Sequence, residues 1–175
     1  MSSITAVKTQ LPRLDDAGLD LLFREGRTSN TFSPDPVELD TLKSIYEVAK
    51  FGPTQANSQP WHIVFLTSDE AKARLLPHMG EGNRDKTGTA PVVAIVAADG
   101  DFNEHMPEVF PHAPDSKFWF GELENRHDVA RFNTGLQVGY FITTIRAHGL
   151  AAGPMTGYDA DGINEEFFAG TNRRV

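Results

Sequence analysis

The stretch GPTQANSQPWHIVFL occupies residues 52–66 and joins a predicted helix to a predicted strand. Before it, apolar side chains recur at helical spacing over residues 39–49, and the Gly52-Pro53 pair ends that helix. After it, the apolar run of residues 61–66 is typical of a short strand. The loop between them carries no charge and is rich in amides and hydroxyls. Such a composition raises the question of what the loop binds.

A second apolar run, PVVAIVA at residues 91–97, has the unbroken pattern of a strand that is buried on both faces. Helical patterns at residues 15–24, 68–76, 122–148 and about 163–168 alternate with these strands. We therefore expect an α/β (α+β) chain whose sheet is covered by helices on both faces. A sheet of two strands is not independently stable, so a further strand or a second chain is needed. Residues 150–152 are a candidate for a brief strand.

The segment of residues 101–120 is rich in Phe, Pro and His and has no clear period. Because it is long for a plain connection, we interpret it as a lid or binding loop. The long helix that follows has apolar residues on more than one face, which indicates burial in the core or against another subunit.

The composition restricts the class of protein. A chain of 175 residues suits one domain, which we place at residues 15–175 after a mobile leader at residues 1–14. With no cysteine there is no thiol chemistry, and the chain fits a reducing cytoplasm. A net charge of -8 argues against nucleic acid as a partner, and no apolar run is long enough to predict a membrane span.

Local motifs for metal, nucleotide or hydrolase chemistry are weak. The six histidines form no metal-binding spacing, so we expect no metal. There is no glycine-rich phosphate motif and no GxSxG elbow, although Ser58, His112 and Asp115 could be imagined as a triad. An anion could bind at Arg27 and the hydroxyls that follow it. On these residues alone, a pairing of Arg27 with a surface carboxylate is the simpler alternative.

Four stretches in order resemble the FMN-dependent nitroreductases across nearly the whole chain. They are RTSNTF at residues 27–32, GPTQANSQPW at 52–61, GNRDKTGTAPVVAIV at 82–96 and GPMTGY at 153–158. Within that family the chain is similar to the malonic semialdehyde reductase branch. The closer match is carried by LFREGRTSN, FGPTQANSQP, VFPH, AAGPMTG and EEFFAGT.

The resemblance implies a three-layer α-β-α sandwich and an intertwined homodimer with FMN sites at the interface. Arg27 would hold the FMN phosphate, with Thr28 and Ser29 beside it. Residues that would reach the flavin from the second subunit are Pro53, Thr54 and Asn57.

The remaining cofactor residues implied by the resemblance would surround the flavin ring. Asn83 and Lys86 would contact its polar edge, where a cation stabilises the negative charge of the reduced form. The backbone of Thr156 and Gly157 would approach N5, with Pro154 shaping the turn, because a glycine lets backbone come close. An asparagine both donates and accepts, which suits the alternating groups of the ring edge.

The resemblance also implies ping-pong transfer of hydride from NADH or NADPH to a small electrophile, with malonic semialdehyde reduced to 3-hydroxypropanoate as one candidate reaction. The carbonyl oxygen then needs a donor, and the candidates in the chain are His112, Arg131 and Asn133. The segment of residues 101–120 would roof the pocket.

The family pattern continues past EEFFAG with an apolar strand and a tail, whereas this sequence ends at TNRRV. We therefore expect a domain that is C-terminally incomplete relative to the family, with Arg173 and Arg174 lying before that strand. Two alternatives to the enzyme stay open: a non-catalytic flavin-binding or dimerisation module, and an acidic interaction domain without cofactor.

Overall fold

The computed structural model of the protein describes residues 11–175. Residues 1–10, and with them most of the expected leader at 1–14, lie outside the described residues. The short helix α1 (Asp16–Leu19) begins at Asp15, whose carboxylate accepts from the Gly18 backbone N–H at 2.8 Å. The predicted helix of residues 15–24 continues beyond α1 only as the π-helical turn η1 (Asp20–Arg24).

The sheet has three antiparallel strands in the order β1-β2-β3, comprising β1 (Trp61–Leu66), β2 (Val93–Asp99) and β3 (Arg173–Arg174). Trp61 pairs with Ala98 and Leu66 with Val93, so the loop of the opening stretch enters the sheet beside the end of β2. The expectation that Arg173 and Arg174 precede a strand was wrong, because they form β3 themselves.

The candidate strand at residues 150–152 is also wrong, since these residues have no regular structure. The carbonyl of Ala152 accepts from the Ser29 backbone N–H at 3.0 Å, so this segment packs against residues of the N-terminal region and not in a ladder.

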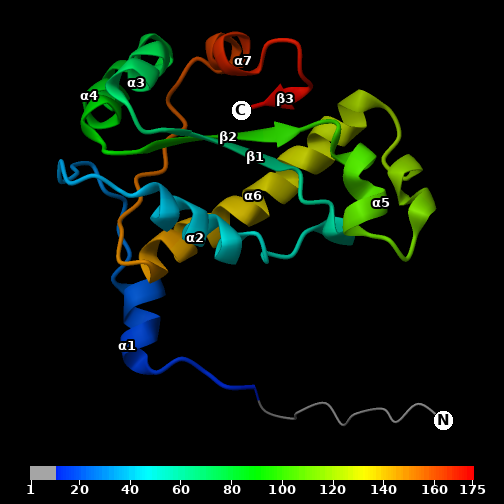
Figure 1. Ribbon diagram of the computed structural model, residues 1–175, viewed down its shortest axis with the longest axis horizontal. Helices are drawn as coiled ribbons and strands as arrows, with labels where there is room; N and C mark the ends of the chain where they lie inside the picture. The colour runs from blue at the N-terminus through cyan, green and yellow to red at the C-terminus, as the bar shows by residue number, and fades with distance from the viewer. Residues whose placement is uncertain (1–10) are drawn as a thin grey trace.

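Helices cover both faces of the sheet (Figure 1). On one face lie α2 (Leu39–Ala49) and α6 (Leu123–Ala147), and on the other lie α3 (Asp69–Leu75), α4 (Glu81–Thr89) and α7 (Ala160–Phe168). The predicted three-layer α-β-α sandwich is confirmed. Across the part of the chain that is described, every helix is too short or too polar to cross a membrane.

The core follows the period-two alternation of the strands. From β2, the side chains of Val93, Ile95 and Ala97 pack with α7, whereas Ala94 and Val96 face the cluster of α2 and α6. Burial on both faces is what the unbroken apolar run of the sequence indicated. Helix α4 was not predicted, because its sequence EGNRDKTGT has almost no apolar side chain to reveal a period.

The segment of residues 101–120 folds into three short helical turns, η4 (Phe102–His105), α5 (Met106–Val109) and η5 (Pro114–Phe118). Its prolines limit the length of each turn, since proline lacks the N–H that a longer helix needs. Phe102, Met106 and Phe120 are buried in a cluster of their own. The segment is therefore anchored by a small core, although Phe118 and Trp119 remain exposed.

A trough of about 940 Å³ runs beside β2. It is bordered by residues 91–96, by the segment 149–156 and by one side of α6. Within residues 11–175, Val93–Ala97 of β2 have strand partners only on the β1 side. This edge of β2 is therefore open over these residues of the described chain.

Candidate functional site

The first group of predicted site residues gathers around α4. We use the name α4 cluster for residues 27–30, Asn83, Lys86 and residues 153–157. Lys86 Nζ donates to Asn30 Oδ1 at 3.2 Å, and Asn83 Nδ2 donates to the Gly157 carbonyl at 2.9 Å. The structure thus brings together three stretches that lie far apart in the sequence.

Two glycines make this approach possible. A Cβ on Gly157 would lie 2.7 Å from Asn83 Nδ2, and a Cβ on Gly153 would overlap the Ser29 carbonyl oxygen. A larger residue at 153 would push the turn away from residue 29, and one at 157 would displace the Asn83 amide from its bond to the turn. The two glycines therefore have a steric role within the chain itself, in addition to the close approach to the flavin that was predicted for Gly157.

Both cations of the α4 cluster keep unused donors. Arg27 Nη1 donates to the carbonyls of Arg24 at 2.9 Å and Gly26 at 2.7 Å. In the described part of the chain, no carboxylate lies within ion-pair distance of Arg27 or Lys86. The alternative in which Arg27 pairs with a surface carboxylate is therefore wrong, and its remaining N–H groups can meet an anion. Thr28, Pro154 and Thr156 are exposed in the same region.

The second group lies in the 53–59 loop, the segment between Gly52 and Pro60. Asn57 is exposed and donates through Nδ2 to the Val109 carbonyl at 2.7 Å, and Thr54 Oγ1 accepts from the Gln59 N–H at 3.1 Å. Pro53 is exposed beside them. Residues 56, 57 and 59 have φ values of 49°, 52° and 46°, although none of them is glycine. Such a conformation persists only where the surroundings hold it.

These two groups lie at opposite ends of the chain's own sheet (Figure 1). Beside residue 27, Arg146 of α6 donates to the Leu21 carbonyl at 2.8 Å, whereas Asn133 on the same helix bonds to the 53–59 loop. At the helical rise per residue, Asn133 and Arg146 are about 20 Å apart. The length of β1 gives a similar separation, about 17 Å, between the loop and the end next to α4. One chain therefore does not place both groups around one small ligand.

The three candidate substrate contacts do not converge. His112 is exposed and its ring lies tilted against that of Phe110 with centroids 3.8 Å apart, while Arg131 is exposed at the border of the trough. Asn133 is fully buried. Its Oδ1 accepts from the Gln55 backbone N–H at 2.7 Å and its Nδ2 donates to the Val129 carbonyl at 2.9 Å. Both of its polar groups are thus engaged inside the protein.

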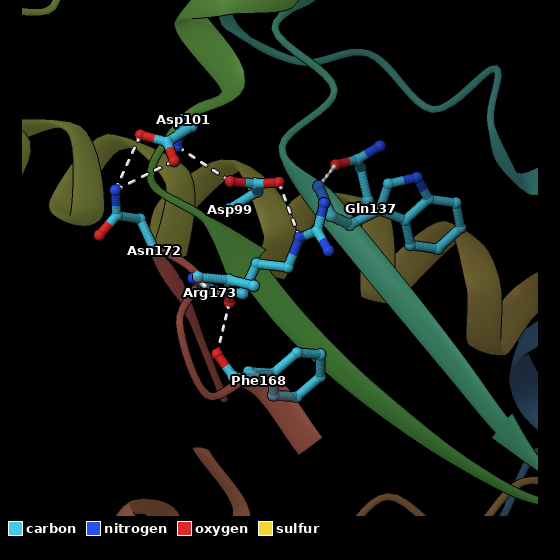
Figure 2. A network of polar contacts seen from close by, with 8 residues as sticks. Asp99, Asp101, Gln137, Phe168, Asn172 and Arg173 are labelled. Atoms are coloured by element: carbon cyan, nitrogen blue, oxygen red, sulfur yellow. Dashed lines mark hydrogen bonds and ion pairs between the residues drawn. The ribbon is translucent and has the colours of Figure 1, made fainter. Parts of the chain in front are cut away.

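A polar network lies at the end of the sheet nearest the 53–59 loop, and the sequence analysis did not predict it. Figure 2 shows Asp99 paired with Arg173 and Asp101 bonded to Asn172. The Asp99–Arg173 ion pair is 2.9 Å long, and it ties β3 to β2. The two residues are 74 positions apart in the sequence, so no local pattern links them and only the pairing of the strands exposes this network.

Two histidines border this network. Burial lowers the pKa of His62, Arg173 lowers it further and Asp99 opposes both. Burial likewise lowers the pKa of His127, whose Nε2 is buried without a hydrogen-bond partner among the described residues. Arg174 adds to the lowering of that pKa. Both rings are therefore neutral in the folded chain near neutral pH.

Comparison with known proteins places this architecture in a class. The fold matches solved nitroreductase structures, including one from Exiguobacterium sibiricum in complex with FMN, with a TM-score of 0.79 and 20% identity over 95% of this chain and 86% of that chain. An NAD(P)H:FMN oxidoreductase from Staphylococcus epidermidis, so named provisionally, has a TM-score of 0.79 at 21% identity, covering 94% of this chain and 84% of that chain. At such identities the likeness defines the fold.

Sequence comparison then gives the family. The nitroreductase family profile matches residues 24–169. A Streptomyces griseus protein, named provisionally as an NADH dehydrogenase/NAD(P)H nitroreductase, is 53% identical over 155 residues, which are 88% of this chain and 79% of the relative. The chain belongs to the nitroreductase family.

Proposed function

We propose that the protein is an FMN-dependent NAD(P)H oxidoreductase that reduces a small electrophile, with malonic semialdehyde as the candidate substrate and 3-hydroxypropanoate as the product. The observation that carries this proposal is the α4 cluster, in which two cations without carboxylate partners among residues 11–175 meet a close backbone turn. Membership of the nitroreductase family supports the same chemistry. The choice of malonic semialdehyde rests on the sequence resemblance to that branch.

The residues of the α4 cluster fit FMN. Arg27 offers a planar guanidinium for the phosphate, with the hydroxyls of Thr28 and Ser29 beside it. Asn83 and Lys86 suit the polar edge of the ring, and the glycine at 157 adds no side chain where backbone would approach the ring. When bound, FMN supplies a group that accepts hydride from NADH or NADPH and gives it to the substrate.

In this proposal, each protein group has a separate task. Lys86 Nζ has one hydrogen-bond partner in the described chain, Asn30 Oδ1, and keeps donors free to stabilise negative charge at the ring edge. Asn83 holds the turn through its bond to the Gly157 carbonyl. Arg131 borders the trough as an exposed cation, which suits the carboxylate of a small acid. His112 is the candidate proton donor to the carbonyl oxygen.

The site is completed, we propose, by a second copy of the chain. The α4 cluster and the 53–59 loop are each candidate flavin contacts but lie at opposite ends of one sheet, so the loop of one copy would serve the α4 cluster of the other. A suitable face exists on α6, where Phe132, Leu136 and Tyr140 are exposed one turn apart. A Cβ added to Gly135 or Gly139, between these side chains, would meet nothing within 4 Å, which leaves space for a close helix approach.

The central test uses the purified chain and added FMN. We expect a yellow protein, or uptake of FMN with a flavin spectrum, and bleaching of that spectrum when NADH or NADPH is added under exclusion of oxygen. A colourless protein that takes up no FMN would overturn the proposal. A stable yellow spectrum on mixing with both nicotinamides would instead indicate a flavin-binding module without turnover.

Light scattering after size exclusion tests the dimer. We expect the mass of two chains, and we expect Leu136→Glu to give one chain with weakened FMN uptake. A monomer that binds FMN as tightly as the unaltered protein would contradict the composite site. Turnover with malonic semialdehyde, compared with a nitroaromatic and a quinone at equal concentration, then tests the substrate.

A further inference from the structure

A line of side-chain amides connects the core of α6 to the exposed Asn57. Gln137 of α6 is fully buried, and its Oε1 accepts from the Trp61 backbone N–H at 3.2 Å. Its Nε2 donates to Gln59 Oε1 at 2.7 Å. Gln59 Nε2 in turn donates to Asn57 Oδ1 at 2.7 Å, and Asn57 Nδ2 donates to the Val109 carbonyl at 2.7 Å. We call this line the amide relay.

The direction of the relay is forced by its two ends. A backbone N–H can only donate, so Gln137 must present its oxygen to Trp61 and its nitrogen to Gln59. That choice makes Gln59 present its oxygen inward and its nitrogen to Asn57. At the other end, the Val109 carbonyl can only accept, which again requires the Asn57 nitrogen. Both ends thus demand the same orientation of every amide.

The amide relay is bonded to a loop whose backbone is in an unfavourable conformation. Residues 56, 57 and 59 are in the left-handed region, which is unfavourable for non-glycine residues and least so for asparagine. A second buried amide of α6, Asn133, is one turn before Gln137 and accepts from the Gln55 N–H at 2.7 Å. Two side chains of one helix therefore hold the loop at its beginning and at its end.

The orientation of Asn57 decides what it can offer a ligand. One of its two N–H bonds goes to Val109 and one lone pair of its oxygen to Gln59, which leaves one donor and one acceptor in fixed positions. We infer that Gln137 and Gln59 are positioning residues that fix the direction of the Asn57 amide, so that this asparagine meets the flavin edge with a defined donor and acceptor. This inference rests on the proposed function, in which Asn57 is a flavin contact.

A double-mutant cycle tests this role. Gln59→Met cuts the relay at its partly exposed link and removes the side-chain bonds to both Gln137 and Asn57. We expect FMN binding to weaken by about tenfold, which is the order of one hydrogen bond's contribution. The cycle then repeats this substitution in a protein that also carries Asn57→Gly, because glycine removes the amide and tolerates the positive φ. In that background, Gln59→Met should have less than about a twofold further effect. A tenfold loss of FMN affinity in both the unaltered and the Asn57→Gly protein would overturn the inference. No loss in the unaltered protein would also overturn it.

Two further variants guard against effects on folding. Gln137→Met removes the buried start of the relay, and its effect on FMN binding should also disappear in the Asn57→Gly background. Thr144→Val is the matched control, since Thr144 is buried on the same helix but has no bond to the loop. We expect Thr144→Val to leave FMN binding unchanged, and a loss equal to that of Gln137→Met would indicate a general effect of altering α6.

A measurement without cofactor separates this inference from the proposed function. In the NMR spectrum of the FMN-free protein, the side-chain amide of Asn57 should give two sharp, widely spaced proton signals. In Gln59→Met these signals should move together and exchange faster with water. Unchanged Asn57 signals would overturn the relay even if FMN binds, whereas failure of the unaltered protein to take up FMN, with the signals shifted as expected, would overturn the flavin role alone.

Discussion

The α4 cluster and the 53–59 loop are both candidate cofactor contacts, but the fold holds them in different ways. In the α4 cluster, the two cations are half-buried or exposed and bond only to an amide or to backbone carbonyls. In the loop, two fully buried amides from α6 hold the backbone, and three of its residues are in the left-handed region. The α4 cluster keeps unused cationic donors, whereas the backbone of the loop is held by hydrogen bonds to Asn133 and Gln137.

This difference indicates how each region would meet a ligand. The loop is organised before binding, so it would lose little conformational entropy when a ligand arrives. The α4 cluster relies on close approach of the backbone at glycines, and its charges have no partner of opposite sign among residues 11–175. Substitutions should therefore act through sterics and charge in the α4 cluster and through hydrogen-bond geometry in the loop.

The largest effect is expected from Gly153→Ala, which breaks the α4 cluster. The new Cβ would overlap the Ser29 carbonyl oxygen, and because that atom is backbone it cannot turn aside. We expect a loss of stability of about 3 kcal/mol, measured by urea unfolding, together with loss of FMN uptake. The control is Gly88→Ala, whose Cβ would have ordinary contacts at 3.7 Å. Equal stability of the two variants would show that the turn can move.

Lys86→Met tests whether the unused charge of the α4 cluster has the chemical role proposed for it. The substitution keeps most of the volume and removes a single hydrogen bond to Asn30. We expect FMN reduction by nicotinamide to slow by about tenfold, with unfolding free energy changed by less than about 0.5 kcal/mol. Lys43→Met, which removes an exposed lysine of α2, should leave the rate unchanged. An unaltered rate in Lys86→Met removes this residue from the site.

The free energy of unfolding should depend on pH through two histidines at the end of the sheet near the 53–59 loop. The pKa values of His62 and His127 are lowered in the fold, mainly by burial. The unfolded chain therefore binds protons first, and stability is fully present above the ordinary pKa of 6.5 and declines as pH falls below it. Unfolding in urea between about pH 7.5 and about pH 5.5 measures this decline.

The two histidines can be tested singly in that experiment. We expect His62→Gln and His127→Gln each to reduce the decline in unfolding free energy as pH falls. In a Trp119→Phe protein, Trp61 remains as a fluorescence probe of this end of the sheet. Stability that rises as the solution is acidified would, in the unaltered protein, contradict the lowered pKa values.

The smallest effect is expected from Ala56→Gly in the loop. Glycine relieves the left-handed backbone of residue 56 by about 1 kcal/mol but loses a similar amount of entropy on folding. We expect a change in unfolding free energy within about 0.5 kcal/mol, whereas Ala49→Gly in the ordinary helix α2 should cost about 1 kcal/mol or more. Equal losses in the two variants would show that the loop backbone is not strained.

The accuracy of the sequence predictions followed the strength of the local pattern. Helix α2 and strand β1 have the predicted bounds, because a regular apolar period and a Gly-Pro stop specify them. Helix α4 was missed since it is almost entirely polar, and β3 was missed since two arginines have no strand period. The candidate strand at residues 150–152 failed because its backbone bonds to residue 29.

The predictions of site residues differ in the same way between residues that a local pattern marks and residues that it does not. In the α4 cluster, Asn83 bonds to Gly157 and Lys86 bonds to Asn30, while the roles of these residues toward FMN stay predictions. Asn133 was selected as a substrate contact, yet its burial and its two internal hydrogen bonds place it beneath the loop. Gln137 was not selected at all, because a glutamine within a long helix has no local pattern that distinguishes it from a surface residue.

The sequence by itself determined the sandwich class, the family and the stretches that form the candidate site, because apolar periodicity and short motifs are local properties. Only the tertiary structure decided which side chains of α6 reach the 53–59 loop, which direction the amide of Asn57 takes, and that the loop and the α4 cluster lie at opposite ends of one sheet. These features depend on contacts between residues distant in sequence, and the geometry of such contacts exists only once the helices have packed on the sheet.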